Sequence, residues 1–182
     1  MDGSPADRMD QEFLAYPLRE LAAAALQAAR DRGAGHADFR AERIRGQMLR
    51  LSDGKLETQA DSDDIGLAVR VVVDGTWGFA ATVDLTPEAA AHAAAAACAV
   101  ARTAAPLAAD RIELAVEPAW GEVSWVSDYE TDPFSVPIAD KADLLAGWSS
   151  GLLARDGVDH VDASLLQVKE CKIGRASCRE RV

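Results

Sequence analysis

The chain has 182 residues, of which 49% are hydrophobic, and a formal net charge of -11. This length and composition predict one folded domain, or one domain and part of a second. The negative charge argues against nucleic acid or an anionic membrane as a partner, since both repel acidic surfaces. The acidic, polar start is unlike a signal peptide, and no apolar run could span a bilayer. Three cysteines without metal-site spacing indicate a reduced, cytoplasmic protein.

The first third of the chain predicts a helix followed by strands. Residues 1–16 are expected to form a flexible leader. Apolar residues at helical spacing predict an amphipathic helix over residues 17–32, with Pro17 at its first position. Alternating apolar and charged residues then predict a strand over 36–52, which ends at a turn formed by Asp53-Gly54. We expect the acidic residues 61–64 to form a further turn.

A hairpin centred on Asp74-Gly75 is the strongest local pattern. Asp-Gly favours a type I′ turn, in which both central residues have positive φ. A two-residue turn places Arg70 opposite Phe79 and Val72 opposite Trp77, so that a guanidinium can lie over an aromatic ring. On the other face, large residues of the first strand meet small residues of the second, which suits a closely packed helix. We therefore expect four antiparallel strands in up-and-down order.

The second helix is predicted to begin at Thr86-Pro87 and to run through an alanine-rich segment, which completes an N-terminal α+β domain over residues 17–105. Residues 106–137 are rich in proline and aromatic residues and are expected to be a connection with one strand near 111–116. Its aromatic residues, from Trp120 to Phe134, could form a binding surface, but clamping the connection onto the core is the favoured interpretation.

Residues 138–171 are expected to form a helix over 138–154, with Leu144, Leu145, Trp148 and Leu152 near one face, and then a strand over 158–169. We expect this strand to enter a further sheet whose partners are absent. The predicted fold class is therefore α+β: a four-stranded antiparallel sheet with helices packed on one face, plus the truncated start of a second αβ unit.

The last residues, 172–182, differ in character from the acidic chain before them. The segment IGRASCRERV is the translation of ATC GGA AGA GCG TCG TGT AGG GAA AGA GTG, a common short-read sequencing adaptor read in one frame. The preceding adaptor bases complete the codon of Lys172. We therefore predict that this tail is an assembly artefact and that the natural chain continues beyond Cys171; the alternative is a genuine basic tail.

Taken alone, the residues assign no catalytic or metal site. His36, His92 and His160 lie far apart in the sequence, and none is at ligand spacing from a cysteine or another histidine. The acidic residues 61–64 could hold calcium weakly, but a solvated turn is favoured because the glycine and distal glutamate of an EF-hand are missing. Cys98, within the alanine-rich helix, is expected to be a small buried hydrophobic residue.

The order of these motifs resembles the N-terminal domain of the TldD/PmbA family, once called modulators of DNA gyrase. The resemblance covers residues 18–169 and includes the turn Asp53-Gly-Lys-Leu-Glu57, which is similar to the family's Asn/Asp-Gly-x-Leu-Glu. It continues through the strand Gly-Leu-Ala-Val-Arg and the segment Gly-Thr-Trp-Gly-Phe-Ala. The family-motif positions, to which a structural role is assigned, are Gly66, Arg70, Gly75, Trp77, Gly78 and Phe79.

The resemblance implies that the intact parent is a cytoplasmic zinc metallopeptidase that processes peptides, or a PmbA-type partner subunit that lacks the zinc ligands. In this family an HExxxH helix normally follows the N-terminal domain. We therefore expect an inactive N-terminal fragment with no catalytic residue and no metal ligand of its own. Peptide substrates and a PmbA-type subunit or homologous dimer are the expected partners. A peptide-binding scaffold is the alternative, and a small standalone regulator would require a natural tail.

Overall fold

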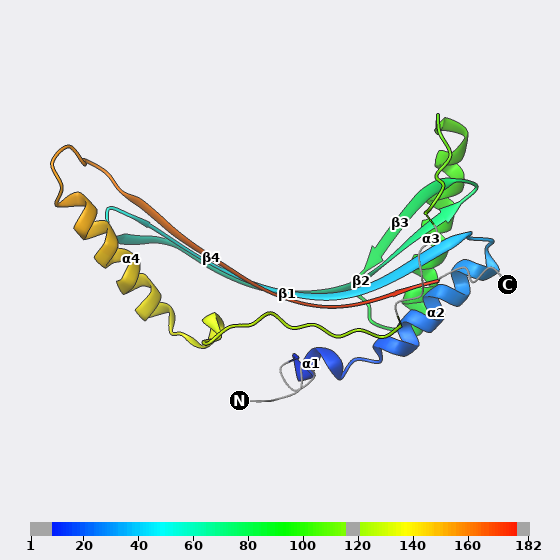
Figure 1. Cartoon of the computed structure of the whole chain (residues 1–182), viewed down its shortest axis with the longest axis horizontal. Coiled ribbons are helices and arrows are strands. Elements are labelled where there is room, and N and C mark those ends of the chain that lie inside the picture. The colour runs from blue at the N-terminus through cyan, green and yellow to red at the C-terminus, as the bar shows by residue number, and fades with distance from the viewer. Residues whose placement is uncertain (1–8, 116–120, 178–182) are drawn as a thin grey trace. The chain divides into compact units, whose positions relative to one another are not determined.

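The computed structural model describes residues 9–115 and 121–177. Four strands form one antiparallel sheet with accompanying helices, which confirms the predicted α+β class (Figure 1). The strand order is β3-β2-β1-β4. The strands are β1 (His36–Ser52), β2 (Lys55–Val73), β3 (Thr76–Thr82) and β4 (Asp162–Ala176).

The chain divides into two compact units, and each is described by itself. Unit 1 comprises the described parts of residues 1–43, 65–126 and 171–182, and unit 2 comprises residues 44–64 and 127–170. Unit 1 holds α1 (Gln11–Leu14), α2 (Leu18–Asp31), α3 (Pro87–Ala104) and the short helix η2 (Ala105–Leu107). Unit 2 holds η3 (Pro133–Ser135) and α4 (Ile138–Leu153).

In unit 1, α2 and α3 pack against each other and against the inward face of the sheet (Figure 1). Alternate residues of β1 and β2 are buried in this core, as period-2 burial on one face of a sheet requires. The buried strand residues are Ala37, Phe39, Ala41, Leu67, Val69, Val71 and Val73. The helix residues buried in the same core are mostly alanines, which lets both helices pack closely against the sheet.

The helix ends in unit 1 follow from local chemistry. Helix α2 lies within one residue of its predicted range, although Pro17 is its N-cap rather than its first helical residue. The helix ends in a Schellman motif, since Gly33 has φ +72° and its N–H bonds Arg30 O, while Ala34 N–H bonds Ala29 O. Helix α3 begins as predicted, because Thr86 Oγ1 accepts a hydrogen bond from Ala89 N–H at 3.1 Å.

The central hairpin has the predicted register. Arg70 is paired with Phe79, and Val72 with Trp77. Asp74 and Gly75 have φ values of +50° and +71°, as a type I′ turn requires. The Asp53-Gly54 turn shows the same conformation, with φ values of +48° and +77°.

The predicted acidic turn at residues 61–64 is wrong, because β2 runs through it without a break. Two of its carboxylates find partners on β1: Asp61 Oδ2 accepts a hydrogen bond from Gln47 Nε2 at 3.1 Å, and Asp63 Oδ2 lies 3.8 Å from Arg45 Nε. Cross-strand partners for charged side chains make an extended conformation favourable where composition alone suggests a turn. The chain from residue 36 to residue 82 therefore forms three strands rather than four.

The fourth strand of the sheet is β4, which pairs with β1. The prediction that this segment enters a sheet with absent partners is therefore wrong. In unit 2, Asp53 N–H donates to Val161 O at 2.8 Å, and in unit 1, Ser177 N–H donates to Ala37 O at 2.8 Å. Strand β4 continues to Ala176, and Ile173 packs against the core of unit 1. Strand pairing does not test the nucleotide origin of residues 172–182, which stays a prediction.

The described part of the expected leader is folded. Helix α1 is capped by Asp10, whose carboxylate accepts hydrogen bonds from Glu12 and Phe13 N–H. Phe13 is fully buried in the core of unit 1, and Arg43 forms ion pairs with Asp10 and Glu12. The burial of Phe13 in the core thus orders a segment that its polar composition predicted to be flexible.

Helix α4 has the predicted extent, but a different face is buried. Lys141, Leu145 and Ser149 are buried, whereas Leu144 and Trp148 are exposed. Leu145 forms a small core with Leu49 and Leu51 of β1. The face was misjudged because the sheet-facing row includes two polar residues, for which the hydrophobic pattern gives no signal.

The connection before α4 contains no strand within its described residues. Residues 111–115 belong to no helix or strand, and Ile112 N–H bonds Gly75 O at 2.8 Å. Trp120 and residue 116 lie outside the described residues. Of the aromatic residues expected to clamp the connection onto the core, Phe134 is half-buried beneath Arg45, but Trp125 and Tyr129 are exposed. None of the described helices combines the length and the apolar character that crossing a membrane would require.

Candidate functional site

The family-motif residues lie on β2, the hairpin turn and β3 of unit 1. They fall into two groups, glycines that permit close packing and side chains on the outer face of the sheet. Gly78 faces the core, where a Cβ atom would lie 1.9 Å from Ala97 O of α3. Gly66 is also close to backbone, since its Cβ would lie 3.0 Å from Thr82 O. These glycines permit close packing and carry no chemistry of their own.

Arg70, Trp77 and Phe79 lie on the opposite face of the sheet, which the helices of unit 1 leave uncovered. Strand alternation places them there, because Val69, Val71 and Gly78 point into the core. The same alternation in β1 puts His36 and Asp38 on this outer face, since Ala37 and Phe39 are buried. We call His36, Asp38, Arg70, Trp77 and Phe79 the outer-face cluster.

Arg70 is the centre of the outer-face cluster. Its Nε–H donates to Asp38 Oδ2 at 2.8 Å, and its Cζ lies 4.7 Å from the ring centroid of Trp77. His36 Nε2 lies 3.5 Å from the same Asp38 oxygen, and its ring meets Trp77 edge-on at 6.2 Å. The predicted contact between a guanidinium and an aromatic ring is therefore present. Asp38 is engaged by both Arg70 and His36, so this geometry suits the positioning of Arg70 for binding better than catalysis.

A second polar set lies between α4 and the sheet in unit 2. Lys141, only 4% exposed, donates from Nζ to Gln47 Oε1 at 2.5 Å, and Gln47 Nε2 donates to Asp61 Oδ2. This chain of hydrogen bonds satisfies a buried lysine and ties α4 to β1 and β2. Because Lys141 and Gln47 are both buried and bonded to each other, we interpret this chain of hydrogen bonds as structural.

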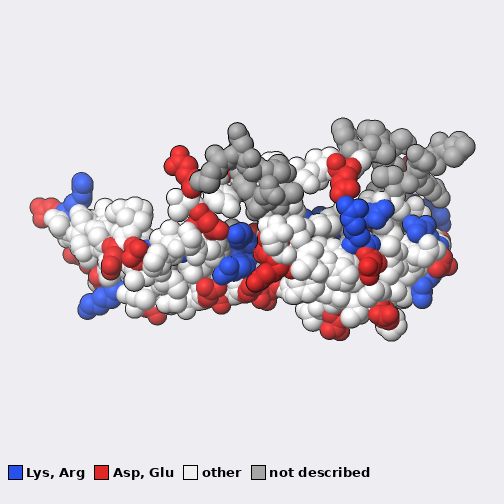
Figure 2. Space-filling model, turned by 90° about the horizontal axis from the view of Figure 1, so that it is seen from below, with Lys and Arg blue, Asp and Glu red and all other residues white. Residues whose placement is uncertain are grey.

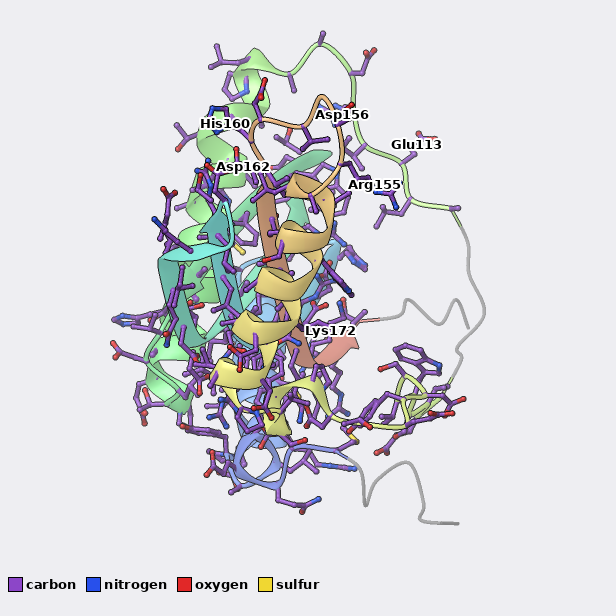
Figure 3. All side chains as sticks on the ribbon, turned by 90° about the vertical axis from the view of Figure 1, so that its left-hand side faces the viewer. Glu113, Arg155, Asp156, His160, Asp162 and Lys172 are labelled. Atoms are coloured by element: carbon purple, nitrogen blue, oxygen red, sulfur yellow. The ribbon has the colours of Figure 1, made fainter. Side chains whose placement is uncertain are left out.

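Two carboxylates in unit 2 fix loops to strands. Val161 N–H and His160 bond Asp53 and lower the pKa of that carboxyl. Figure 3 shows His160 near Asp162, with Asp156 in the preceding loop. A hydrogen bond from Lys169 lowers the pKa of Asp132, and Asp132 also caps η3 by accepting from Phe134 N–H.

The described residues do not fit a zinc ion. Among residues 9–115 and 121–177, no three His, Cys, Asp or Glu side chains gather as a metal site would require. Burial raises the pKa of the Cys98 thiol, so this cysteine stays protonated and is no activated nucleophile. On the face shown in Figure 2, acidic and basic groups are interspersed in small clusters.

Sequence reasoning found Arg70 and Trp77 as neighbours but missed Asp38 and His36. Alternation along β1 could have assigned both to the outer face. Alternation alone could not place His36 and Asp38 beside Arg70, because that requires the pairing register of β1 with β2. The predicted turn at residues 61–64 interrupted β2, so this register could not be derived. Lys141 was missed because a lysine on an apolar helix is ordinarily exposed.

Comparison with known proteins agrees with the fold and the hairpin motif. Residues 37–101 match the family model described as PmbA/TldA metallopeptidase domain 1. A solved structure from Bacteroides thetaiotaomicron, described as a modulator of DNA gyrase, superposes with a TM-score of 0.68 at 18% identity over 87% of this chain. A protein of the same description from Thermotoga maritima gives a TM-score of 0.64 at 17% identity over 90% of this chain.

This chain spans only 36% of the length of each of those two proteins. At such identities the superpositions show the fold alone. Among curated protein sequences, none matches the chain. The match to the TldD/PmbA family model extends over residues 37–101, which include the central hairpin, and supports the family resemblance of this part of the chain.

Proposed function

We propose that the chain is the N-terminal part of a cytoplasmic TldD-like zinc metallopeptidase that processes peptides. The observation that carries this proposal is the match of residues 37–101 to domain 1 of a metallopeptidase family. The two solved structures extend well beyond the part this chain covers, and the proposal assigns the HExxxH helix to that remaining part. The role of residues 17–105 would then be to support the catalytic part and to contact peptides or a partner subunit.

The described residues offer no set of ligands for zinc, so the proposal gives them no step in the cleavage of a peptide bond. What this chain supplies is a sheet that carries the outer-face cluster, in which Arg70 and Phe79 are exposed. We propose that the intact protein works with a PmbA-type subunit or as a homologous dimer.

The decisive experiment is to sequence the genomic DNA without interruption past codon 171. A reading frame that continues into a helix with HExxxH supports the metallopeptidase. A frame that encodes IGRASCRERV and then stops contradicts both the fragment proposal and the predicted artefact.

The purified 182-residue chain provides a second test. We expect neither stoichiometric zinc by elemental analysis nor cleavage of an unfolded peptide, because the described residues provide neither ligands nor an activated base. Bound zinc together with cleavage that a chelator abolishes would contradict this expectation.

A non-catalytic PmbA-type subunit, or a peptide-binding scaffold, is the second candidate. The geometry of the outer-face cluster favours it, since these groups are arranged for binding rather than for acid–base chemistry. The same DNA sequence distinguishes the two candidates: a long continuation without HExxxH supports the partner subunit.

A further inference from the structure

Arg70 is held from two sides while the rest of its guanidinium stays free for a ligand. Asp38 accepts from Nε at 2.8 Å, and the ring of Trp77 covers one face of the guanidinium at 4.7 Å. Among the residues that the structure describes, Arg70 donates a side-chain hydrogen bond through Nε alone. The side chain is 52% exposed. The outer edge, formed by the two Nη groups, can therefore reach a ligand in solvent.

This arrangement is the one that carboxylate recognition needs. A guanidinium presents parallel N–H groups that match the two oxygens of a carboxylate. The contacts with Asp38 and Trp77 fix its orientation before a ligand arrives, which lowers the entropy cost of binding. Asp38 is held in turn by His36, whose Nε2 lies 3.5 Å from the same oxygen.

Phe79 adds an apolar contact beside this charge. It is the cross-strand partner of Arg70, and 59% of it is exposed. Phenylalanine and arginine are both enriched at protein interfaces relative to the rest of the surface. A ligand that carries a carboxylate next to an apolar side chain would contact both.

We propose that Arg70, Trp77 and Phe79 form a binding subsite for a carboxylate carried by a peptide, with an adjacent apolar side chain placed on Phe79. All of the residues involved belong to unit 1. The proposal does not depend on whether the parent cleaves peptides, so the loss of one proposal leaves the other intact. Because Asp38 already neutralises part of the charge, we expect weak binding, with a Kd of about 1 mM.

Nuclear magnetic resonance titration of the full 182-residue chain tests the subsite. The probes are acetyl-Ala-Leu-Phe with a free C-terminal carboxylate, the same peptide as its amide, and acetyl-Ala-Glu-Phe-amide. We expect the carboxylate probes, but not acetyl-Ala-Leu-Phe-amide, to shift the Arg70 Nε–H and Trp77 indole signals in a saturable way. Comparison of the two acidic probes shows whether a terminal or a side-chain carboxylate is preferred.

Two substitutions and one matched control complete the design. Arg70→Lys keeps the charge but loses the parallel N–H groups, and should weaken binding about fivefold. Phe79→Ala should weaken it about threefold. Arg50→Lys is the control, since Arg50 is a similarly exposed arginine paired with one carboxylate, Asp162 Oδ1, at 3.5 Å. It should leave the Kd unchanged.

Three outcomes would overturn the proposal: no saturable shift of the Arg70 and Trp77 signals with either acidic probe, equal binding of acetyl-Ala-Leu-Phe-amide, or an equal loss of affinity in Arg50→Lys. The contrast between acid and amide is measured on the unaltered chain, so the test does not depend on how well a variant folds.

Discussion

Gly78 lies where α3 packs closely against the sheet. A Cβ atom there would lie 1.9 Å from Ala97 O and 2.9 Å from the Cβ of Ala101. Both obstacles belong to the helix, one of them to its backbone, so neither can move aside as a flexible side chain would. The small residues on both sides, the alanines of α3 and Gly78 of β3, therefore allow a short distance between helix and sheet.

We predict that Gly78→Ala destabilises the protein by about 3 kcal/mol, because the helix must be displaced to admit the methyl group. Gly147→Ala is the matched control, since nothing lies within 4 Å of its added Cβ and alanine favours a helix interior by roughly 0.5–1 kcal/mol. Urea unfolding of the two variants measures both effects. Equal stabilities would show that α3 does not pack closely against Gly78.

At the scale of elements, the turn between β1 and β2 is fastened to the start of β4 through one carboxylate. Asp53 Oδ1 accepts from Val161 N–H at 2.9 Å, and Oδ2 lies 3.1 Å from His160 Nδ1. These contacts, the backbone hydrogen bond first, lower the pKa of Asp53 below its ordinary value of 3.8. The turn thus gains a link to the residues just before β4, more than a hundred positions later in the chain.

The pH dependence of stability follows from the direction of this shift. Because the folded-state pKa is lowered, the contribution of Asp53 is fully present above pH 3.8 and is lost as the pH falls through the folded-state value. We predict that the free energy of unfolding falls less between about pH 5 and pH 2.5 in Asp53→Asn than in the unaltered chain. Asp132, whose pKa is also lowered, contributes the same acid loss to both proteins.

The control for this comparison is Asp110→Asn, an exposed position in the connection after α3. It should retain the full acid dependence, as measured by urea unfolding at each pH. If Asp53→Asn and Asp110→Asn behave alike, the contacts of Asp53 with Val161 and His160 do not contribute to stability.

The elements that could be predicted are those whose information is local. Asp74-Gly75 sets the hairpin register within two residues, and Thr86 sets the start of α3, so both were predicted correctly. Asp61 and Asp63 were misread because their partners lie on another strand. The outer-face cluster was half predicted for the same reason: Arg70 and Trp77 share a hairpin, but Asp38 reaches them only through sheet pairing.

For the whole molecule, the last described residues complete the sheet of unit 1. Strand β4 extends to Ala176, and Ile173 packs against the core. Ala37 N–H donates to Ser177 Oγ at 2.9 Å, and Ala37 O accepts from Ser177 N–H at 2.8 Å. The first residues of β1 thus depend on the final residues of the described chain, with most of the sequence between them.

We predict that a chain ending at Cys171 loses the hydrogen bonds that protect the Ala37 amide from exchange with solvent. Amide exchange at Ala37 should become at least about tenfold faster, because its partners are gone, and the missing Ile173 side chain should lower the stability by about 1 kcal/mol. The amides of Leu49 and Leu51 should change little, since the residues packed on them in unit 2 all precede position 171. Hydrogen exchange measured by nuclear magnetic resonance resolves these positions.

A chain ending at Ser177 is the control, because it keeps the hydrogen-bond partner of Ala37. Unchanged exchange at Ala37 in the shorter chain would mean that residues 172–177 do not pair with β1 in solution.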